Sequence, residues 1–118
     1  MATYSRMLLS GSTNGKPIKI SATATAGTTV HTALTGTAGF DEIYIWLTNT
    51  DTVARTVTIE YGSVTDPDGL ICKAVSLPAS SPPIPILTGQ VLNNAQVVAI
   101  FASATNVILA TGYVNRIV

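Results

Sequence analysis

The sequence predicts an all-β protein, a single-domain antiparallel β-sandwich of jelly-roll-like type, with an immunoglobulin-like sandwich as the alternative. Short segments alternate apolar and polar residues with the period of two that strands require, and clusters of turn-forming residues separate them. No window repeats apolar residues at helical spacing over ten positions. The 118 residues are expected to form one domain (1–118) with a core of its own.

Seven strands are predicted from this alternation, at residues 18–20, 30–34, 43–47, 56–61, 70–77, 95–102 and 107–114. The segment 95–102 is apolar on both faces, so we expect it inside a sheet and covered on both sides. Residues 82–85 contain three prolines, which cannot donate to a strand ladder, and we expect an edge or loop segment there.

Residues 43–47 and 56–61 are predicted to form a hairpin in which position 47 pairs with 57 and position 45 with 59. This arrangement leaves Tyr44 and Trp46 on the outer face of the sheet. Three interpretations of these aromatic side chains stay open: an anchor in a protein interface, a second buried face of a central strand, or a platform for sugar rings. Of these we favour the protein interface.

The chain ends are predicted to be short arms, residues 1–9 and 115–118, that dock onto neighbouring molecules. Tyr4, Arg6 and Arg116 on these arms, together with Tyr44 and Trp46, are therefore the candidate partner contacts. The six basic and six acidic residues balance, which argues against nucleic acid and membrane surfaces as partners. No segment predicts a signal peptide or a membrane span.

The inventory of reactive residues argues against an enzyme, a metal site or a cofactor. The one histidine, His31, alternates out of phase with the apolar residues around it and is expected on the surface. The single cysteine, Cys72, is expected to be buried and inert. Asp41 and Glu42 are neighbours in one strand and point to opposite faces, so they cannot act as a pair. The segment 66–69 (DPDG) predicts a β-turn rather than a calcium loop.

Only 10% of the residues are charged, well below the roughly 25% of ordinary soluble domains, while 47% are hydrophobic. The mean hydropathy of +0.43 is high for a monomer. Both values indicate that part of the apolar surface is covered by other subunits, so we expect a homo-oligomer.

Five segments also resemble a known family: MATYSR with LLSG (1–6, 8–11), GKPIKI (15–20), FDEIYIW (40–46), IPI with GQVL (84–86, 89–92) and GYVNRI (112–117). Over nearly its whole length the chain looks like the head decoration, or cement, proteins of some short-tailed phages. The resemblance implies a capsid-surface protein made in the host cytoplasm, a trimer that binds the major capsid protein at a symmetry axis. The alternatives are a tail or head-to-tail adaptor component and a carbohydrate-binding module on the virion.

Overall fold

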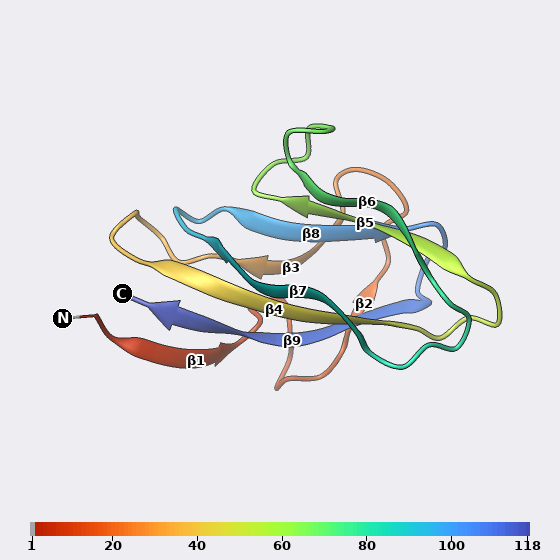
Figure 1. Ribbon diagram of the computed structural model, residues 1–118, viewed down its shortest axis with the longest axis horizontal. Coiled ribbons are helices and arrows are strands. Elements are labelled where there is room, and N and C mark those ends of the chain that lie inside the picture. Colours follow the sequence, from red (N-terminus) through yellow and green to blue (C-terminus); the bar gives the residue numbers. More distant parts are fainter. Residues whose placement is uncertain (1) are drawn as a thin grey trace.

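Two antiparallel sheets lie face to face in the computed structural model, which describes residues 2–118 (Figure 1). Sheet A has the order β1-β9-β4-β7, and β2 also pairs with β9; sheet B has the order β3-β8-β5-β6. The strands are β1 (Tyr4–Leu8), β2 (Ile18–Ile20), β3 (Thr28–Thr32), β4 (Phe40–Asn49), β5 (Arg55–Tyr61), β6 (Leu70–Leu77), β7 (Ile84–Leu92), β8 (Val97–Ala102) and β9 (Ile108–Ile117).

The pairing of strands defines a jelly roll. β5 pairs with β6, β4 with β7, β3 with β8 and β2 with β9, so each of these pairs encloses the one before it along the chain, as in one long hairpin. Rolling such a hairpin gives two four-stranded sheets, in which successive strands from β2 to β9 lie in opposite sheets except for the innermost pair, β5 and β6. An immunoglobulin sandwich has a different strand order. The predicted all-β sandwich is confirmed. β1 is an additional strand on the edge of β9.

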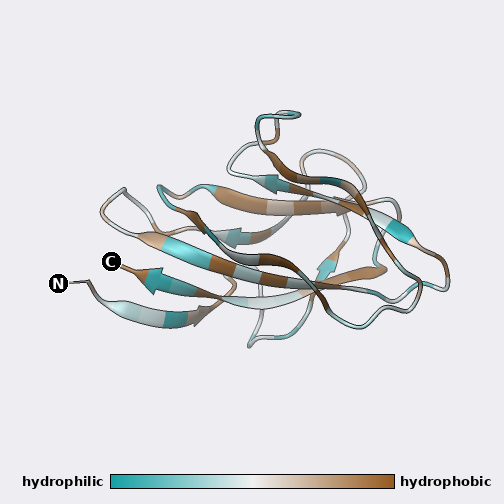
Figure 2. Ribbon diagram, viewed as in Figure 1, coloured by the Kyte–Doolittle hydropathy of each residue, from teal (hydrophilic) through white to brown (hydrophobic). Residues whose placement is uncertain are grey.

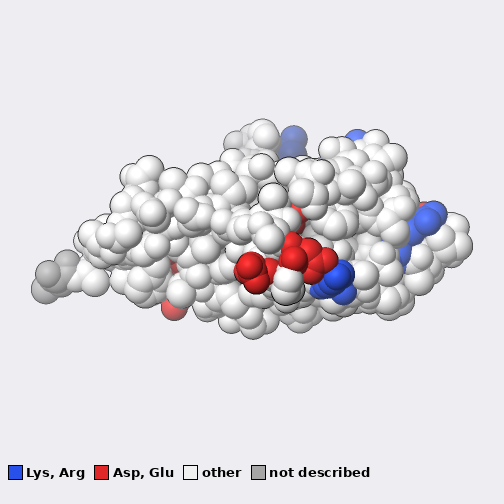
Figure 3. All heavy atoms as spheres, turned by 90° about the horizontal axis from the view of Figure 1, so that it is seen from above, with Lys and Arg blue, Asp and Glu red and all other residues white. Residues whose placement is uncertain are grey.

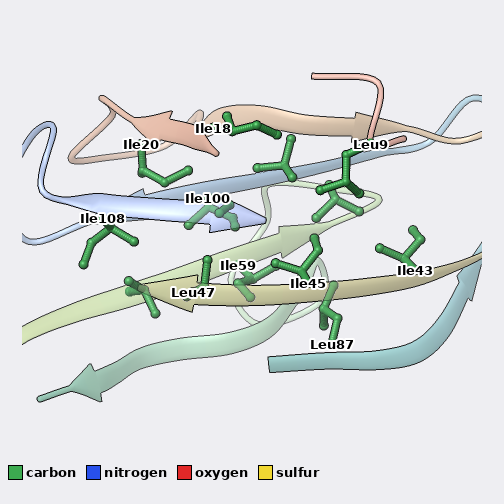
Figure 4. Packing of buried hydrophobic residues seen from close by; sticks show 14 of the residues in the cluster. Leu9, Ile18, Ile20, Ile43, Ile45, Leu47, Ile59, Leu87, Ile100 and Ile108 are labelled. Atoms are coloured by element: carbon green, nitrogen blue, oxygen red, sulfur yellow. The ribbon is translucent and has the colours of Figure 1, made fainter. Parts of the chain in front are cut away.

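The core fills the space between the two sheets. Along β4, buried and half-buried residues alternate without interruption, as expected for a strand with one face in the core. Hydrophobic residues are concentrated in β8 and in the middle of β4 (Figure 2). The labelled aliphatic side chains of both sheets meet between the layers: Leu9, Ile18, Ile20, Ile43, Ile45, Leu47, Ile59, Leu87, Ile100 and Ile108 (Figure 4).

The predicted hairpin between residues 43–47 and 56–61 is wrong, because β4 belongs to sheet A and β5 to sheet B. The inner faces of both strands do point toward the core, as the alternation required. Two strands that face each other across a sandwich show the same apolar pattern as two strands that pair side by side. The pattern therefore could not separate the two arrangements.

Asn49 fixes the point at which the chain crosses between the sheets. Its buried side-chain amide donates to the carbonyl oxygens of Val53, Leu77 and Pro78 at 3.0–3.2 Å, and its Oδ1 accepts from the Asp51 N–H at 2.9 Å. These bonds connect the end of β4 to the loop that precedes β5 and to the end of β6. A single side chain thus satisfies several backbone groups that the crossing would otherwise leave unpaired.

We expect Asn49→Ala to lower the free energy of unfolding by about 2–4 kcal/mol, because buried backbone groups lose their hydrogen-bond partners. Urea denaturation measures this loss. The matched control is Asn93→Ala, which removes a single bond from the Asn93 amide to the Gly39 carbonyl oxygen and should cost about 1 kcal/mol. Equal losses in the two variants would contradict the structural role given to Asn49.

Two strands were not predicted from the sequence, and both lie on the edges of sheet A. Residues 4–8, expected in a terminal arm, form β1 and pair with β9, while residues 115–117 are the last part of β9 itself. The two expected arms are therefore joined to each other within one sheet. The proline segment leads into β7, which is an edge strand of sheet A. β1 and β7 lie at opposite edges of this sheet.

Candidate functional site

An aromatic row crosses the outer face of sheet A. Tyr44 of β4 and Tyr113 of β9 are direct partners in the strand register, and Arg6 of β1 lies on the far side of Tyr113. The Tyr44 and Tyr113 rings are stacked, with centroids 4.9 Å apart and an interplanar angle of 19°. The Trp46 ring lies 6.0 Å from Tyr113 at 31°. We call Arg6, Tyr113, Tyr44 and Trp46 the aromatic row.

The row is held by contacts among its own members. β9 lies between β1 and β4, so Tyr113 is approached by Tyr44 on one side and by Arg6 on the other. The Arg6 guanidinium carbon is 4.7 Å from the ring centroid, a distance at which cation–π attraction operates. Both faces of the Tyr113 ring are therefore occupied from within the molecule.

The surface around the row is apolar and carries few charges. Tyr4, Leu8 and Val91 share the outer face by register and are 62%, 54% and 52% exposed. Aromatic and apolar side chains gathered on one exposed face are typical of interfaces. The charged residues that the register places on this face in the described strands are Arg6, Lys19 and Glu42.

Asn115 lies among these residues with an unsatisfied polar atom. It pairs with Arg6 on one side and with Glu42 on the other, yet it is only 4% exposed. Its buried Oδ1 has no hydrogen-bond partner within residues 2–118. A buried amide oxygen without a donor costs free energy, and a donor from a partner would recover it.

The structure brings together most of the residues that the sequence singled out. Tyr4, Arg6, Tyr44 and Trp46 share the outer face of sheet A, whereas Arg116 projects to the opposite face. Tyr113 was missed. Its position in the row depends on the pairing of β9 with β4, which the alternation within one strand does not reveal.

Arg116 belongs to a buried cluster at the end of the sandwich that holds both chain termini. Its guanidinium donates from Nε to Asp41 Oδ1 at 2.8 Å and from Nη2 to Asp41 Oδ2 at 2.9 Å. His31 Nε2 lies 2.8 Å from the same Oδ2. The cluster joins β3 of sheet B to β4 and β9 of sheet A, so it ties the two layers together.

The prediction that His31 lies on the surface is wrong, since only 2% of it is exposed. The register of β3 with β8 shifts between Thr29 and His31, and both Val30 and His31 are buried as a result. Such a bulge breaks the alternation from which a side chain's direction is predicted. Burial is tolerated because the imidazole is hydrogen-bonded at both nitrogens.

Ser10, His31 and Asp41 approach one another without forming a catalytic triad. The backbone N–H of Ser10 donates to His31 Nδ1 at 3.0 Å, so Nδ1 is an acceptor and Nε2 carries the proton given to Asp41. The Ser10 hydroxyl oxygen accepts from the N–H of Thr32 at 2.7 Å. A triad needs a ring nitrogen free to take the serine proton, and here both are occupied. The arrangement is structural.

Acid should destabilise the fold through His31. Burial lowers the pKa of His31 below 6.5, and although Asp41 acts in the opposite direction it does not restore it. Protonation would also turn Nδ1 into a donor facing the Ser10 N–H. Between the folded pKa and 6.5 the unfolded chain binds a proton that the folded chain does not, so stability falls as pH decreases through this window.

We therefore expect a lower free energy of unfolding at pH 5 than at pH 7.5. His31 is the one histidine of the chain, so His31→Gln should flatten the dependence in this range. Chemical denaturation at a series of pH values measures both slopes. An unchanged slope in the variant would assign the effect to another group.

The pKa of Asp41 is also lowered, because its bonds to Arg116 and His31 outweigh the effect of burial, so its contribution to stability is lost only at lower pH.

The outer face of sheet B is partly covered by the chain itself. Glu60 of β5 is 1% exposed, and its carboxylate accepts from the Gly27 N–H and the Thr25 hydroxyl, both at 2.7 Å. The loop of residues 21–27 lies over the middle of β8, where Ala99 is 5% exposed. Val97 at the start of β8 is 36% exposed, so the second apolar face of this strand is covered only in part. An open groove of about 390 Å³ runs beside Glu60 and Gln96. From above, charged side chains cover only a small part of the molecule (Figure 3).

The remaining candidate residues have ordinary structural surroundings. Residues 66–69 form the predicted turn, and Asp66 makes an exposed ion pair of 2.6 Å with Lys73. Cys72 is half-buried against the core, where burial raises the pKa of its thiol. Within residues 2–118 no group of three or more His, Cys, Asp or Glu side chains is placed to hold a metal ion. The same part of the chain contains no helix able to cross a membrane.

Comparison with protein-family models, with curated proteins and with solved structures finds no match to this chain.

Proposed function

We propose that this protein is a non-enzymatic structural component of a phage virion, which decorates the capsid shell and stabilises it by bridging neighbouring subunits of the major capsid protein. The outer face of sheet A supports this proposal best. It combines the aromatic row with the exposed apolar side chains of Tyr4, Leu8 and Val91. Each bound copy would add binding free energy that only the assembled shell receives. The low charge and high hydropathy of the chain also favour self-association into a closed oligomer.

The arrangement of the rings favours a protein partner over a sugar. A sugar ring stacks on a free aromatic face, but both faces of Tyr113 are occupied by Tyr44 and Arg6. Aromatic rings, an arginine and exposed apolar side chains instead suit the centre of a protein interface, where aromatic residues and arginine are enriched. Trp46, at the end of the row, is the best candidate for an anchor.

Binding to undecorated shells tests the proposal. Wild-type protein should sediment with the shells, and Trp46→Asp should bind at least about 30-fold more weakly, as expected when an interface anchor worth about 2–4 kcal/mol is lost. Trp46 lies on the outer face, so strand content measured by circular dichroism should be retained.

The matched control is Val75→Asp, which places the same charge on an exposed residue of β6 in sheet B. This variant should bind shells like the wild type. Equal shell binding by wild type and Trp46→Asp would contradict the proposal. Binding to tails but not to shells would favour an adaptor role, and a Trp46-dependent affinity for glycans alone would favour a carbohydrate-binding module.

A further inference from the structure

The free edge of β1 is open to a further strand. β1 lies at the lower edge of sheet A in Figure 1, with no strand drawn beyond it. All five of its residues are exposed. The N–H of Val118 donates to the Thr3 carbonyl oxygen at 2.9 Å and the Thr3 N–H donates back to Val118, so these two residues are a hydrogen-bonded pair. Alternation along an antiparallel ladder then directs the N–H and C=O groups of Tyr4, Arg6 and Leu8 away from β9.

The other sheet edges carry features that discourage further pairing. β7 contains Pro85, and its register with β4 shifts twice. β6 contains Lys73 and the left-handed residue Ala74, and its register with β5 also shifts twice. β3 has a bulge at its centre, and β2 is only three residues long. Prolines, lysines, bulges and short strands are the usual protections of sheet edges.

β1 shows none of these protections. Its register with β9 runs over five successive pairs without a shift, and it contains no proline or lysine. Its one charge, Arg6, is folded over the ring of Tyr113 in its own sheet. A regular, apolar, unprotected edge strand is a template for pairing with another strand.

We infer that β1 pairs antiparallel with β1 of a second copy of this chain, joining two A sheets into one continuous sheet across a two-fold axis at Ser5. In this register Tyr4 lies opposite Arg6 of the second copy, and each such pair exchanges two backbone hydrogen bonds. The register centred one residue further along would set Arg6 against Arg6, which is unfavourable. The axis at Ser5 instead places each guanidinium beside a tyrosine.

We assign a second copy of the chain as the partner of this edge, because a two-fold axis at Ser5 pairs β1 with itself. The residues that form the pairs are then already present in β1. The axis is perpendicular to the sheet, so both aromatic rows lie on the same side of the joined sheet. The inference deepens the self-association proposed above and rests on it. It gives a dimer, whereas the trimer expected from the sequence would have to use another surface.

The mass of the full-length protein in solution, measured by light scattering after size exclusion, should be twice the 12.2 kDa of one chain. Tyr4→Pro removes an N–H that points to the second copy and none that binds β9, so this variant should be a folded monomer. Tyr4→Val keeps the N–H and should stay dimeric. A wild-type monomer or trimer, or a dimeric Tyr4→Pro, would overturn the inference.

Cross-linking tests the register without relying on the proline variant. In a Cys72→Ser background, Ser5→Cys should form a disulfide-linked dimer under mild oxidation. A non-hydrogen-bonded pair has Cα atoms about 4.5 Å apart, which a disulfide can span. Met7→Cys should not cross-link, since position 7 faces position 3 of the second copy. Efficient cross-linking of Met7→Cys, or none of Ser5→Cys, would overturn the register. Neither measurement involves shells, so failure here and failure of shell binding are distinguishable.

Discussion

Replacing Asp41 by Ala is expected to lower the free energy of unfolding by about 3–5 kcal/mol, because the change breaks a buried ion pair by removing one partner. Asp41 is fully buried and accepts hydrogen bonds from both Arg116 and His31. Without the carboxylate, the His31 Nε2–H has no acceptor and the guanidinium loses both bonds. These three residues connect the two sheets, so the loss affects the packing of the layers and not only one strand.

Urea denaturation at pH 7.5 measures the effect. The matched control is Asp66→Ala, which removes the acidic partner of an ion pair whose side chains are 50% and 66% exposed. Exposed pairs contribute little, so this variant should resemble the wild type. If Asp41→Ala were no less stable than Asp66→Ala, the cluster would not hold the sheets together.

The fold class was predictable because alternation is a local property of each strand. β4 shows this most clearly, with buried residues at every second position from Asp41 to Asn49. The partner of a strand is not a local property. Ile45 and Ile59 face the same core from opposite sheets, and nothing in their own segments distinguishes this arrangement from a hairpin.

The candidate site was predictable in part for the same reason. The phase of β4 placed Tyr44 and Trp46 outside the core, and the structure agrees. Tyr113 joins them only through the register between β4 and β9, which depends on residues far apart in the sequence. His31 was misplaced because a bulge in β3 shifts the phase by one residue, and no residue type in that segment signals the bulge.

Gly112→Ala is expected to lower the free energy of unfolding by about 4 kcal/mol, the combined cost of a strained backbone and of overpacking. Gly112 lies in β9 opposite Ile45 and has a φ of +154°, a conformation that residues with a side chain rarely adopt. A Cβ at this position would collide with the carbonyl oxygen of Tyr44 and lie 3.1 Å from the Ile45 Cα. These are backbone atoms of the neighbouring strand, so β4 and β9 would have to separate.

The matched control is Gly36→Ala, where φ is +79° but no atom lies within 4 Å of the added Cβ, so only the backbone strain applies. Thermal unfolding should separate the two variants clearly, and equal losses would show that close approach of the strands is unimportant. The Gly112 variant should also disturb the Tyr44–Tyr113 stack, which spans the same pair of strands. Where it still folds, near-ultraviolet circular dichroism of the aromatic side chains should change and shell binding should weaken, because the aromatic row depends on the spacing that Gly112 permits.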